Sequence, residues 1–324
     1  MRAVVCRQHG EPETLAVDEL PDPEPGPGEI LIDVDAAAAA YHDVLQVAGS
    51  HQVRHEVPFV PGMEASGTVA ALGPDVDGPP PGTPVVSLMQ GGAMAELAVA
   101  DATQVWPTGE GIAPVDAAAM AMAFTTAYCG LRWEADVQPG EWLLVTGAAG
   151  GVGLAAVDVG AAMGARVIAV ASSEARLEHA RDRGAEHLVD YTSGSIRETV
   201  DEVTDGQGVA VAFDPVTGPL YEDVARSIGW GGRHVIVGFA GGEIPRIHAG
   251  RLLVKNRRAL GLVMYHYRFH RPERMAAAVR DLFEWRRSGR IEPLVSRVGG
   301  LEDLPGMLTD IRDRRAVGRL VAEI

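Results

Sequence analysis

The sequence predicts an α/β protein that combines a mostly-β unit with a doubly wound parallel-sheet unit. Three observations predict this class. Short apolar stretches alternate with Gly and Pro clusters over the first hundred residues, apolar strands alternate with helical stretches from about residue 142 to 263, and a glycine-rich turn follows the first of those strands. A chain of 324 residues is long enough for two domains that each bury a core.

Proline clusters indicate the β-rich character of the N-terminal part. Residues 21–28 contain four prolines and two glycines, and proline both fixes φ and lacks an amide donor, so this segment is neither a helix nor a central strand. A strand-like stretch, residues 29–35, follows it. A second cluster at residues 78–82 precedes another predicted strand at residues 84–88. Such punctuation is typical of a compact unit of short strands.

The middle of the chain alternates strands with helices. A helix is predicted from Val115 to Leu131, because this Ala- and Met-rich stretch has no breaker before Gly130. The alternation that follows favours right-handed βαβ crossovers and a parallel sheet. The predicted strands are residues 142–145, 166–170, 188–189, 209–213, 234–237 and 259–263, and the tail adds a helix at 272–288, a helix near 304–314 and a strand at 319–322.

Composition and charge exclude several classes of partner. The formal net charge of −16 argues against binding nucleic acid or an anionic membrane surface. No apolar stretch reaches the ~18 residues that a spanning helix needs. Cys6 and Cys129 are far apart and lack metal-ligand spacing, and no leader-like segment opens the chain. We therefore expect a cytoplasmic protein.

The glycine turn at residues 147–153 predicts a dinucleotide site. Its small residues let the backbone approach a pyrophosphate, and the helix that starts near Gly151 offers free amides and a positive dipole end. Gly153 permits close packing of that helix on the strand. A tight turn that binds nothing is the alternative, but four glycines in seven residues within a complete βαβ unit favour the nucleotide.

The end of the next strand distinguishes NADP from NAD. An NAD site places Asp or Glu there, ~20 residues beyond the glycines, to bind the ribose hydroxyl. This chain has Ala171 instead, followed by Ser172, Ser173 and then Arg176. Arg176 can meet a 2′-phosphate bidentately, while Glu174 is expected to cap the helix. The alternative is that Arg176 is an ordinary solvated helix residue. The missing acid and the added cation together favour NADPH.

These residues resemble a known family. The segment Ala148–Gly153, with residues 61–67 upstream, is similar to the zinc-independent, zeta-crystallin-like quinone oxidoreductases of the medium-chain dehydrogenase/reductase superfamily. The resemblance runs from Met1 to Val321. Further matching pieces are residues 125–128, 184–187, 190–191, 231–233 and 237–240.

The resemblance implies a domain plan and an assembly. Residues 1–118 and 265–324 would form a GroES-like catalytic domain, and residues 119–264 a Rossmann NADPH-binding domain inserted within it. The cofactor would lie in the cleft between the domains. Relatives dimerise through the last Rossmann strand, here Arg258 to Val263, and an apolar open edge needs a cover. We therefore expect a homodimer acting on a small electrophilic substrate.

The family's cofactor contacts carry over residue by residue. Tyr191 is placed near the 2′-phosphate, although a packed aromatic at a sheet end is the alternative. Arg319 is either a phosphate contact or a solvated strand residue. The full set is Thr126, Ala149, Gly150, Gly151, Val152, Ser172, Arg176, Tyr191, Val216, Gly238, Phe239, Val263, Met264 and Tyr265.

The resemblance also implies that no metal is bound. Zinc-dependent relatives hold their catalytic ion with two cysteines and a histidine. The corresponding positions here are Ala40, Met63 and Met122, and only the neighbouring Glu64 remains. One carboxylate does not make a zinc site, and the four-cysteine structural lobe is absent as well.

Without a Lewis acid, conjugate reduction is easier than simple alcohol–carbonyl exchange. The protein must hold the acceptor carbon near the hydride donor and offer hydrogen-bond donors to the oxygen. Candidate donors are Tyr41, His42 and His51, in a loop expected to face the cofactor. His51 stands where relatives often have tyrosine, and Ala40 replaces the usual asparagine. The alternatives are a wall residue for Tyr41, a solvent-facing side chain for His42 and a surface histidine for His51.

Three functions follow from these expectations. The first is an NADPH-dependent reductase of quinones or α,β-unsaturated carbonyls. The second is an enoyl-thioester reductase, for which a basic patch for the CoA phosphate would be expected, whereas only scattered arginines lie between Arg246 and Arg258. The third is an NADPH-binding protein with little turnover, which the changes at Ala40 and His51 keep open.

Overall fold

The computed structural model describes residues 1–324 and divides into two compact units. Unit 1 comprises Met1–Met122, Arg268–Gly289 and Pro293–Ile324, and unit 2 comprises Ala123–Tyr267 and Arg290–Glu292. No helix in the chain is both long and apolar enough to cross a membrane.

The main segment of unit 2 ends at Tyr267 rather than at residue 264, and the unit boundaries differ from the predicted domain limits in two further places. The first lies after Met122 rather than after residue 118, because α2 (Pro114–Ala121) packs its alanines against the sheet of unit 1, where Ala118 and Ala119 join a buried cluster with Ala36. The second is the short segment Arg290–Glu292, which groups with unit 2. There the backbone amide of Glu292 donates to the carboxylate of Asp158, 2.9 Å away.

Unit 1 is the predicted β-rich unit. β1 (Arg2–Val5) pairs antiparallel with β2 (Ala16–Glu19), and a seven-stranded sheet has the order β14-β15-β3-β4-β5-β7, with β6 pairing β3. Its strands are β3 (Glu29–Ala39), β4 (Glu64–Leu72), β5 (Pro84–Leu88), β6 (Leu97–Asp101), β7 (Val105–Pro107), β14 (Val295–Gly299) and β15 (Arg319–Glu323). Its helical segments besides α2 are η1 (Pro12–Thr14), α1 (Tyr41–Val47), η2 (Ala102–Gln104), α9 (Tyr267–His270), α10 (Pro272–Arg287), η6 (Leu301–Asp303) and α11 (Leu304–Arg312).

The central strand β3 shows why this sheet forms. Ile30, Ile32 and Val34 are buried in one apolar cluster, whereas Asp33 and Asp35 between and beyond them are exposed. That alternation has the period of two that a half-buried strand requires. The alternation is absent at the C-terminal end of β3. Residues 36–40 are all buried alanines, so both faces of the sheet are covered there.

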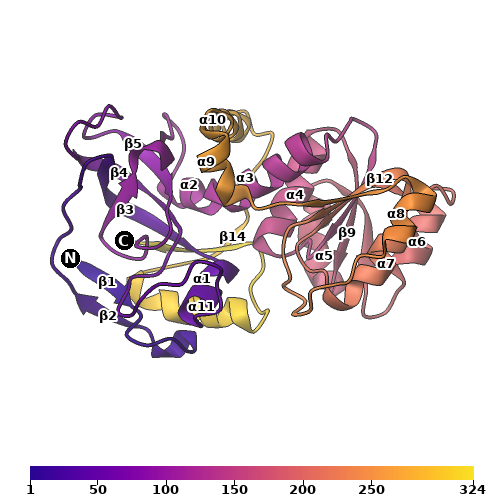
Figure 1. Ribbon diagram of the computed structural model, residues 1–324, viewed down its shortest axis with the longest axis horizontal. Coiled ribbons are helices and arrows are strands. Elements are labelled where there is room, and N and C mark those ends of the chain that lie inside the picture. The colour runs from indigo at the N-terminus through magenta and orange to yellow at the C-terminus, as the bar shows by residue number, and fades with distance from the viewer. The chain divides into compact units, whose positions relative to one another are not determined.

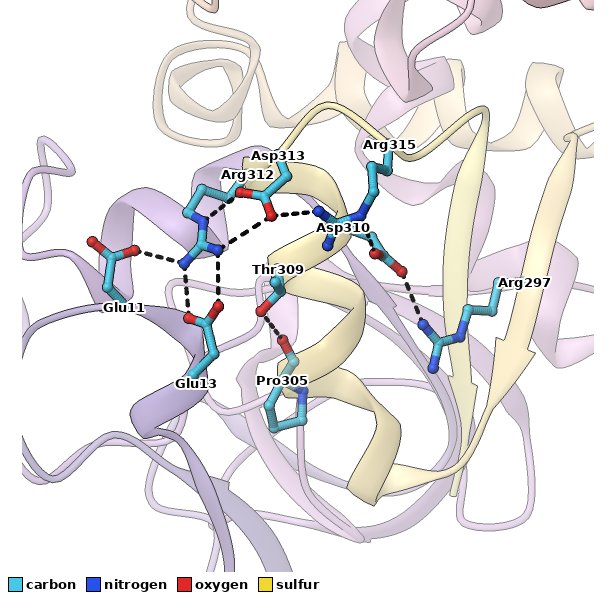
Figure 2. A network of polar contacts seen from close by, with 9 residues as sticks. All are labelled: Glu11, Glu13, Arg297, Pro305, Thr309, Asp310, Arg312, Asp313 and Arg315. Carbon is cyan, nitrogen blue, oxygen red and sulfur yellow. Dashed lines mark hydrogen bonds and ion pairs between the residues drawn. The ribbon is translucent and has the colours of Figure 1, made fainter.

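An exposed polar network holds α11 to the N-terminal segment of unit 1 (Figure 2). Arg312 donates to Glu11 and to both carboxylate oxygens of Glu13 at 2.7–2.8 Å, and also contacts the neighbouring Asp313. Arg315 and Asp310 extend the network along the helix. We call this set, with Arg297, the Arg312 network.

Unit 2 has the predicted parallel sheet, with helices beside its strands (Figure 1). Six strands lie in the order β10-β9-β8-β11-β12-β13, and every neighbouring pair is parallel. The strands are β8 (Trp142–Thr146), β9 (Arg166–Ala171), β10 (Ala185–Asp190), β11 (Val209–Asp214), β12 (Ile228–Ile236) and β13 (Arg258–Gly261). This is the doubly wound order of a Rossmann domain, so the predicted fold class is confirmed.

The helices of unit 2 depart from the prediction at its first boundary. The single helix expected over residues 115–131 is wrong: α2 ends at Ala121, α3 (Ala123–Tyr128) follows, and a π-helical turn covers Cys129–Glu134. The break coincides with the passage of the chain from unit 1 to unit 2. The later helical segments are α4 (Gly151–Ala162), α5 (Glu174–Asp182), α6 (Ile196–Val203), η4 (Gly218–Leu220), α7 (Tyr221–Ser227), α8 (Ala249–Lys255) and η5 (Met264–His266).

Candidate active site

The strand order of unit 2 identifies where a ligand would bind. The order runs outward through β9 and β10 on one side of β8, and through β11, β12 and β13 on the other. Ligands of such sheets bind beyond the carboxyl ends of the strands, at the point where the order reverses. That point lies between the ends of β8 and β11, at Thr146 and Asp214.

The glycine turn lies at this switch point and has the geometry of an anion cradle. Gly147 has a positive φ of 59°, and the amide of Gly150 donates to its carbonyl at 2.9 Å. A Cβ on Gly153 would stand 2.1 Å from the same carbonyl oxygen, so only glycine fits there. Helix α4 starts at Gly151 with no side-chain cap on its first turn. The backbone amides of Gly151, Val152 and Gly153 are therefore available to an anion such as a pyrophosphate.

The residues predicted near the 2′-phosphate lie at two neighbouring strand ends. Ala171 closes β9 opposite Asp190 of β10, and the amide of Tyr191 donates to the carbonyl of Ala171 at 3.1 Å. Ser172 is exposed beside them, and the Tyr191 side chain is 37% exposed, so this aromatic is not packed into the sheet end. Buried Ala171 puts no carboxylate where NAD sites have one.

Arg176 lies in the first turn of α5, after these strand ends. Its amide donates to the hydroxyl of Ser173, which is the residue that caps the helix, at 3.4 Å. The expectation that Glu174 caps this helix is therefore wrong: the cap needs an acceptor that precedes the first turn, and Ser173 occupies that place. Glu174 is exposed in the first turn, and Arg176 is half-buried.

The loops after β11 and β12 pack against the glycine turn. A Cβ on Gly147 would lie 2.9 Å from a methyl group of Val216, so this side chain rests on the first glycine of the turn. The carbonyl of Val216 accepts from the amide of Gly241 at 2.8 Å, and a Cβ on Gly238 would lie 3.3 Å from the carbonyl oxygen of Pro215. Phe239, next in the loop, is 40% exposed. The structure thus brings Val216 and Gly238 to the turn.

The remaining predicted contacts lie on elements around this core. Thr126 is buried in α3, which packs against α4. Val263 follows β13 and is 48% exposed, while Met264 is buried at the start of η5 and Tyr265 is half-buried.

A buried polar cluster beneath the switch point was not predicted. The carboxylate of Asp214 is fully buried and accepts from the hydroxyl of Thr146 at 2.6 Å and from the amide of Thr217 at 2.7 Å. Nε2 of His234 lies 3.0 Å from its second oxygen. Burial opposes the charge, but the bonds from His234 and the other donors outweigh it and hold the pKa of Asp214 below its ordinary value. The sequence contains one local indication of this cluster, because Asp214 follows the apolar residues 209–213 and immediately precedes Pro215.

Two of the three predicted donors, Tyr41 and His42, lie in a helix of unit 1 rather than in a loop. Tyr41 begins α1 and is 42% exposed, and the carboxylate of Asp43 accepts from the amide of Ala40 at 2.8 Å, which fixes the start of the helix. His42 has a side chain only 20% exposed, with Nε2 3.3 Å from Asp43. A solvent-facing His42 is therefore wrong. Burial alone would lower the pKa of His42, but the charge of Asp43 outweighs burial and raises it.

His51 lies beyond α1 in a turn. Its Nδ1 is 3.2 Å from both the amide and the carbonyl of Val53, and its ring is half-buried. Burial, with a smaller contribution from His42, lowers its pKa. The surroundings of His51 therefore favour its neutral form, whereas those of His42 favour its protonated form.

A buried ion pair lies where zinc-dependent relatives hold their metal. Glu64 is fully buried and accepts from the amide of Met122 at 2.9 Å and from the guanidinium of Arg319. Arg319 is 5% exposed and bonded to Glu64, so it is not a solvated strand residue, and the alternative of a phosphate contact stays a prediction. The reason is electrostatic: a buried carboxylate needs a partner, and burial raises the pKa of Glu64 even with Arg319 beside it.

The residues at the corresponding zinc positions do not suit zinc. Ala40, Met63 and Met122 are all buried, and none of them is a usual zinc ligand. The carboxylates nearby are already engaged, Glu64 with Arg319 and Asp43 with the amide of Ala40. The chain holds no group of three or more His, Cys, Asp or Glu side chains arranged for a metal ion.

The chain matches two protein families. Residues 26–110 match the alcohol dehydrogenase GroES-like domain, and residues 151–284 match the zinc-binding dehydrogenase family. These spans fall on unit 1 and mainly on unit 2, and the second begins at the first residue of α4.

Similar proteins cover the chain from end to end. A quinone oxidoreductase-like protein 2 homolog of Nematostella vectensis is 36% identical over 99% of this chain and 88% of that protein. An acryloyl-coenzyme A reductase of Sulfurisphaera tokodaii is 27% identical over the whole of both chains. Among solved structures, the Escherichia coli quinone oxidoreductase complexed with NADPH superposes with a TM-score of 0.93 at 25% identity, covering all of both chains.

Proposed function

The chain belongs to the medium-chain dehydrogenase/reductase superfamily, among its quinone oxidoreductase-like members, and on that premise we propose that it is an NADPH-dependent reductase of quinones or α,β-unsaturated carbonyl compounds. The observation that carries the proposal is the glycine turn at the switch point. It is followed by the end of β9 and the start of α5, where Ala171, Ser172 and Arg176 stand in place of an acid.

Each part of the site has a proposed role toward the cofactor. The first amides of α4 bind the pyrophosphate, and Ser172, Arg176 and Tyr191 bind the 2′-phosphate. Bound NADPH supplies the hydride. The loops that carry Val216 and Gly238 border the nicotinamide, and the small size of glycine lets the backbone approach it. Phe239 and the residues 263–265 complete this end of the site.

Reduction also needs a proton, for which unit 1 offers candidate donors. Tyr41 and His51 can hydrogen-bond an oxygen on which negative charge develops. His42 is the candidate whose surroundings favour the protonated form, because Asp43 raises its pKa. We expect His42→Gln to remove an ionisation from the pH profile of kcat/KM, with His55→Gln as the control. An unchanged profile would exclude His42 as the donor.

We propose that catalysis needs no metal, because the site residues do not suit zinc and Glu64 is occupied by Arg319. Metal analysis of the purified protein should find no stoichiometric zinc, and a chelator should leave activity intact. Zinc at one equivalent per chain, lost together with activity, would contradict this.

The cofactor assignment is tested by Arg176→Ala. Loss of a charge-assisted contact to the 2′-phosphate should raise the dissociation constant for NADPH by ~10-fold and leave that for NADH nearly unchanged. The matched control is Arg181→Ala on the same helix, where the guanidinium is bonded to Glu178 at 2.6–2.7 Å. Equal effects on both nucleotides would show that Arg176 does not meet the phosphate.

A substrate panel separates the reductase from a protein that only binds NADPH. Oxidation of NADPH should be measured with a series of quinones and enones at saturating cofactor. Turnover with either class supports the proposal. Tight NADPH binding with no turnover on the whole panel would favour a cofactor-binding protein.

An enoyl-thioester reductase is the second candidate, favoured by the similarity to an acryloyl-coenzyme A reductase over the full chain. The experiment compares an acryloyl thioester of CoA with that of pantetheine, which lacks the nucleotide. Faster reduction of the CoA thioester would favour this candidate. Equal rates would indicate that the protein recognises only the conjugated carbonyl group.

We propose that the protein is a homodimer formed through the open edge of β13. β13 pairs only with β12, and large apolar side chains lie exposed on β12 and on α8, which packs against β12. Trp230 is 73%, Leu253 78% and Val254 74% exposed. Sedimentation velocity should show a dimer, and Trp230→Glu with Leu253→Glu should shift it toward monomer. A monomeric wild type would contradict the proposal.

Two buried free thiols, Cys6 and Cys129, are consistent with the reducing cytoplasm that we propose as its location.

A further inference from the structure

The Asp214 carboxylate joins three parts of the proposed cofactor site. Thr146 immediately precedes the glycine turn, Val216 and Thr217 form the loop that rests on it, and His234 lies on β12. The hydroxyl of Thr146 and the amides of Val216 (3.2 Å) and Thr217 donate to one oxygen, and His234 faces the other. A carboxylate only accepts, so Nε2 of His234 carries the hydrogen in this contact.

The loop held by this carboxylate is strained. Thr217 has φ 51° and ψ −129°, in a region that a β-branched residue rarely adopts. Its amide is bonded to Asp214, and its hydroxyl donates to the carbonyls of Val216 at 2.7 Å and Gly238 at 3.2 Å. Strain of this kind persists only where surrounding contacts impose it, and it concentrates at functional sites.

These contacts set the distance between the turn and the two loops. A methyl group of Val216 packs directly against Gly147, and the carbonyl of Gly238 accepts from the hydroxyl of Thr217. A shift of either loop would therefore also require Thr217 to move. Thr217 is in turn bonded to the same carboxylate oxygen as Thr146. Hydrogen bonds and packing therefore connect the glycine turn and the two loops, with Asp214 at the centre of these contacts.

We propose that Asp214, with Thr146 and His234, is a positioning group that holds the glycine turn and the Val216 and Gly238 loops at the separation the nicotinamide nucleotide requires. This rests on the proposed function and adds to it. The positioning group acts through Thr146 and Thr217 and does not touch the cofactor. A purely structural role would affect folding stability alone, whereas positioning affects cofactor affinity beyond any change in stability.

The first test replaces Thr146 with valine, which has the same shape and leaves the charge of Asp214 in place. We expect the dissociation constant for NADPH, measured by calorimetry, to rise ~3–10-fold, as for one lost hydrogen bond. The matched control is Thr204→Val in the same unit, because the Thr204 hydroxyl is also buried, donates to Val200 at 2.6 Å and accepts from Gly208 at 2.9 Å. Thr204 precedes β11, at the opposite end of that strand from Asp214.

The control should lose melting temperature while keeping wild-type affinity for NADPH. If Thr146→Val also keeps wild-type affinity, the proposed positioning role is wrong. A wild-type protein that binds no nicotinamide nucleotide would overturn both this inference and the proposed function, whereas normal wild-type binding with an unaffected Thr146→Val overturns this inference only.

The second test uses the strained residue itself. Thr217→Gly relieves the unfavourable φ, so the melting temperature should fall less than in Thr217→Ala, which keeps the strain and also lacks the hydroxyl. Both variants should bind NADPH more weakly and lower kcat, because the loop is no longer fixed to Gly238. Wild-type affinity and kcat in Thr217→Gly would contradict the proposal.

Discussion

The Asp214 cluster of unit 2 and the Arg312 network of unit 1 use carboxylates in opposite surroundings. Asp214 has no exposed surface and is satisfied by two backbone amides, a hydroxyl and an imidazole. Arg312 and its acidic partners lie at the surface, with Arg312 29%, Glu13 52% and Glu11 69% exposed. Water competes for every bond of the second set and for none of the first.

The difference teaches which polar groups this fold depends on. An exposed charge pair exchanges one set of water contacts for another and contributes little to folding, and Arg312 has several interchangeable partners. A buried carboxylate cannot be left unpaired, so each of its partners is required. The buried Glu64–Arg319 pair extends the comparison to full charges, because the guanidinium of Arg319 is the main group that offsets the desolvation of Glu64.

The largest expected effect comes from breaking that pair with Arg319→Met. Glu64 would remain buried with only the amide of Met122, so the free energy of unfolding should fall by about 3–5 kcal/mol at pH 7.5. Because burial raises the pKa of Glu64 above its unfolded value, the carboxyl takes up a proton as pH falls and the loss shrinks toward pH 5. Urea unfolding at the two pH values measures this.

The double variant Glu64→Gln with Arg319→Met removes both charges and should recover part of the loss. If Arg319→Met alone costs less than about 1 kcal/mol at pH 7.5, this pair behaves like a surface pair and the contrast with the Arg312 network fails.

A second, intermediate effect is expected at Asp158, a buried carboxylate without a full partner. Arg183 is 3.9 Å away, and burial raises the pKa of Asp158 to about 6. A carboxyl whose folded pKa is raised costs stability as pH rises from about 4 through about 6. Asp158→Asn keeps an oxygen for the amide of Glu292 and should therefore gain about 2–3 kcal/mol at pH 8, with no gain at pH 4.

Thermal unfolding of the wild type and Asp158→Asn across this pH range measures the gain. Asp190→Asn is the control, because Asp190 is bonded to Thr192 and its pKa is lowered by those bonds. A loss of stability in Asp158→Asn at pH 8 would show that the charged form is needed, and the buried carboxylates of unit 2 would then share the behaviour of Asp214.

The smallest effect is expected in the Arg312 network itself. Arg312→Ala should lower the melting temperature by only on the order of 1–2 °C, because all the groups involved stay hydrated. The network lowers the pKa of Asp313 to about 2, so its contribution is present above about pH 4 and fades as pH falls toward 2. Repeating the melt in 1 M salt should abolish the difference, whereas the effect of Arg319→Met should persist. If the melting temperature of Arg312→Ala is still lowered in 1 M salt, the Arg312 network does not differ from the buried Glu64–Arg319 pair in the way proposed.

Local chemistry determined much of this protein from its sequence. The period-two pattern of β3, the strand–helix alternation of unit 2 and the glycine turn all depend on residues close together in the chain, so the fold class and the dinucleotide turn follow from them. The helix over 115–131 failed, because its interruption lies where the chain passes from one packed unit to the other, which no local pattern records.

Partners distant in sequence were decided only by tertiary structure. Asp214 meets Thr146 across 68 residues because β11 and β8 are neighbours in the sheet, and Glu64 meets Arg319 across 255 residues because β4 and β15 both pair with β3. His42 is largely shielded from solvent for a similar reason, since the elements packed around α1 decide which of its side chains water reaches. Periodicity and turn chemistry act within a few residues, whereas strand order is a property of the assembled sheet.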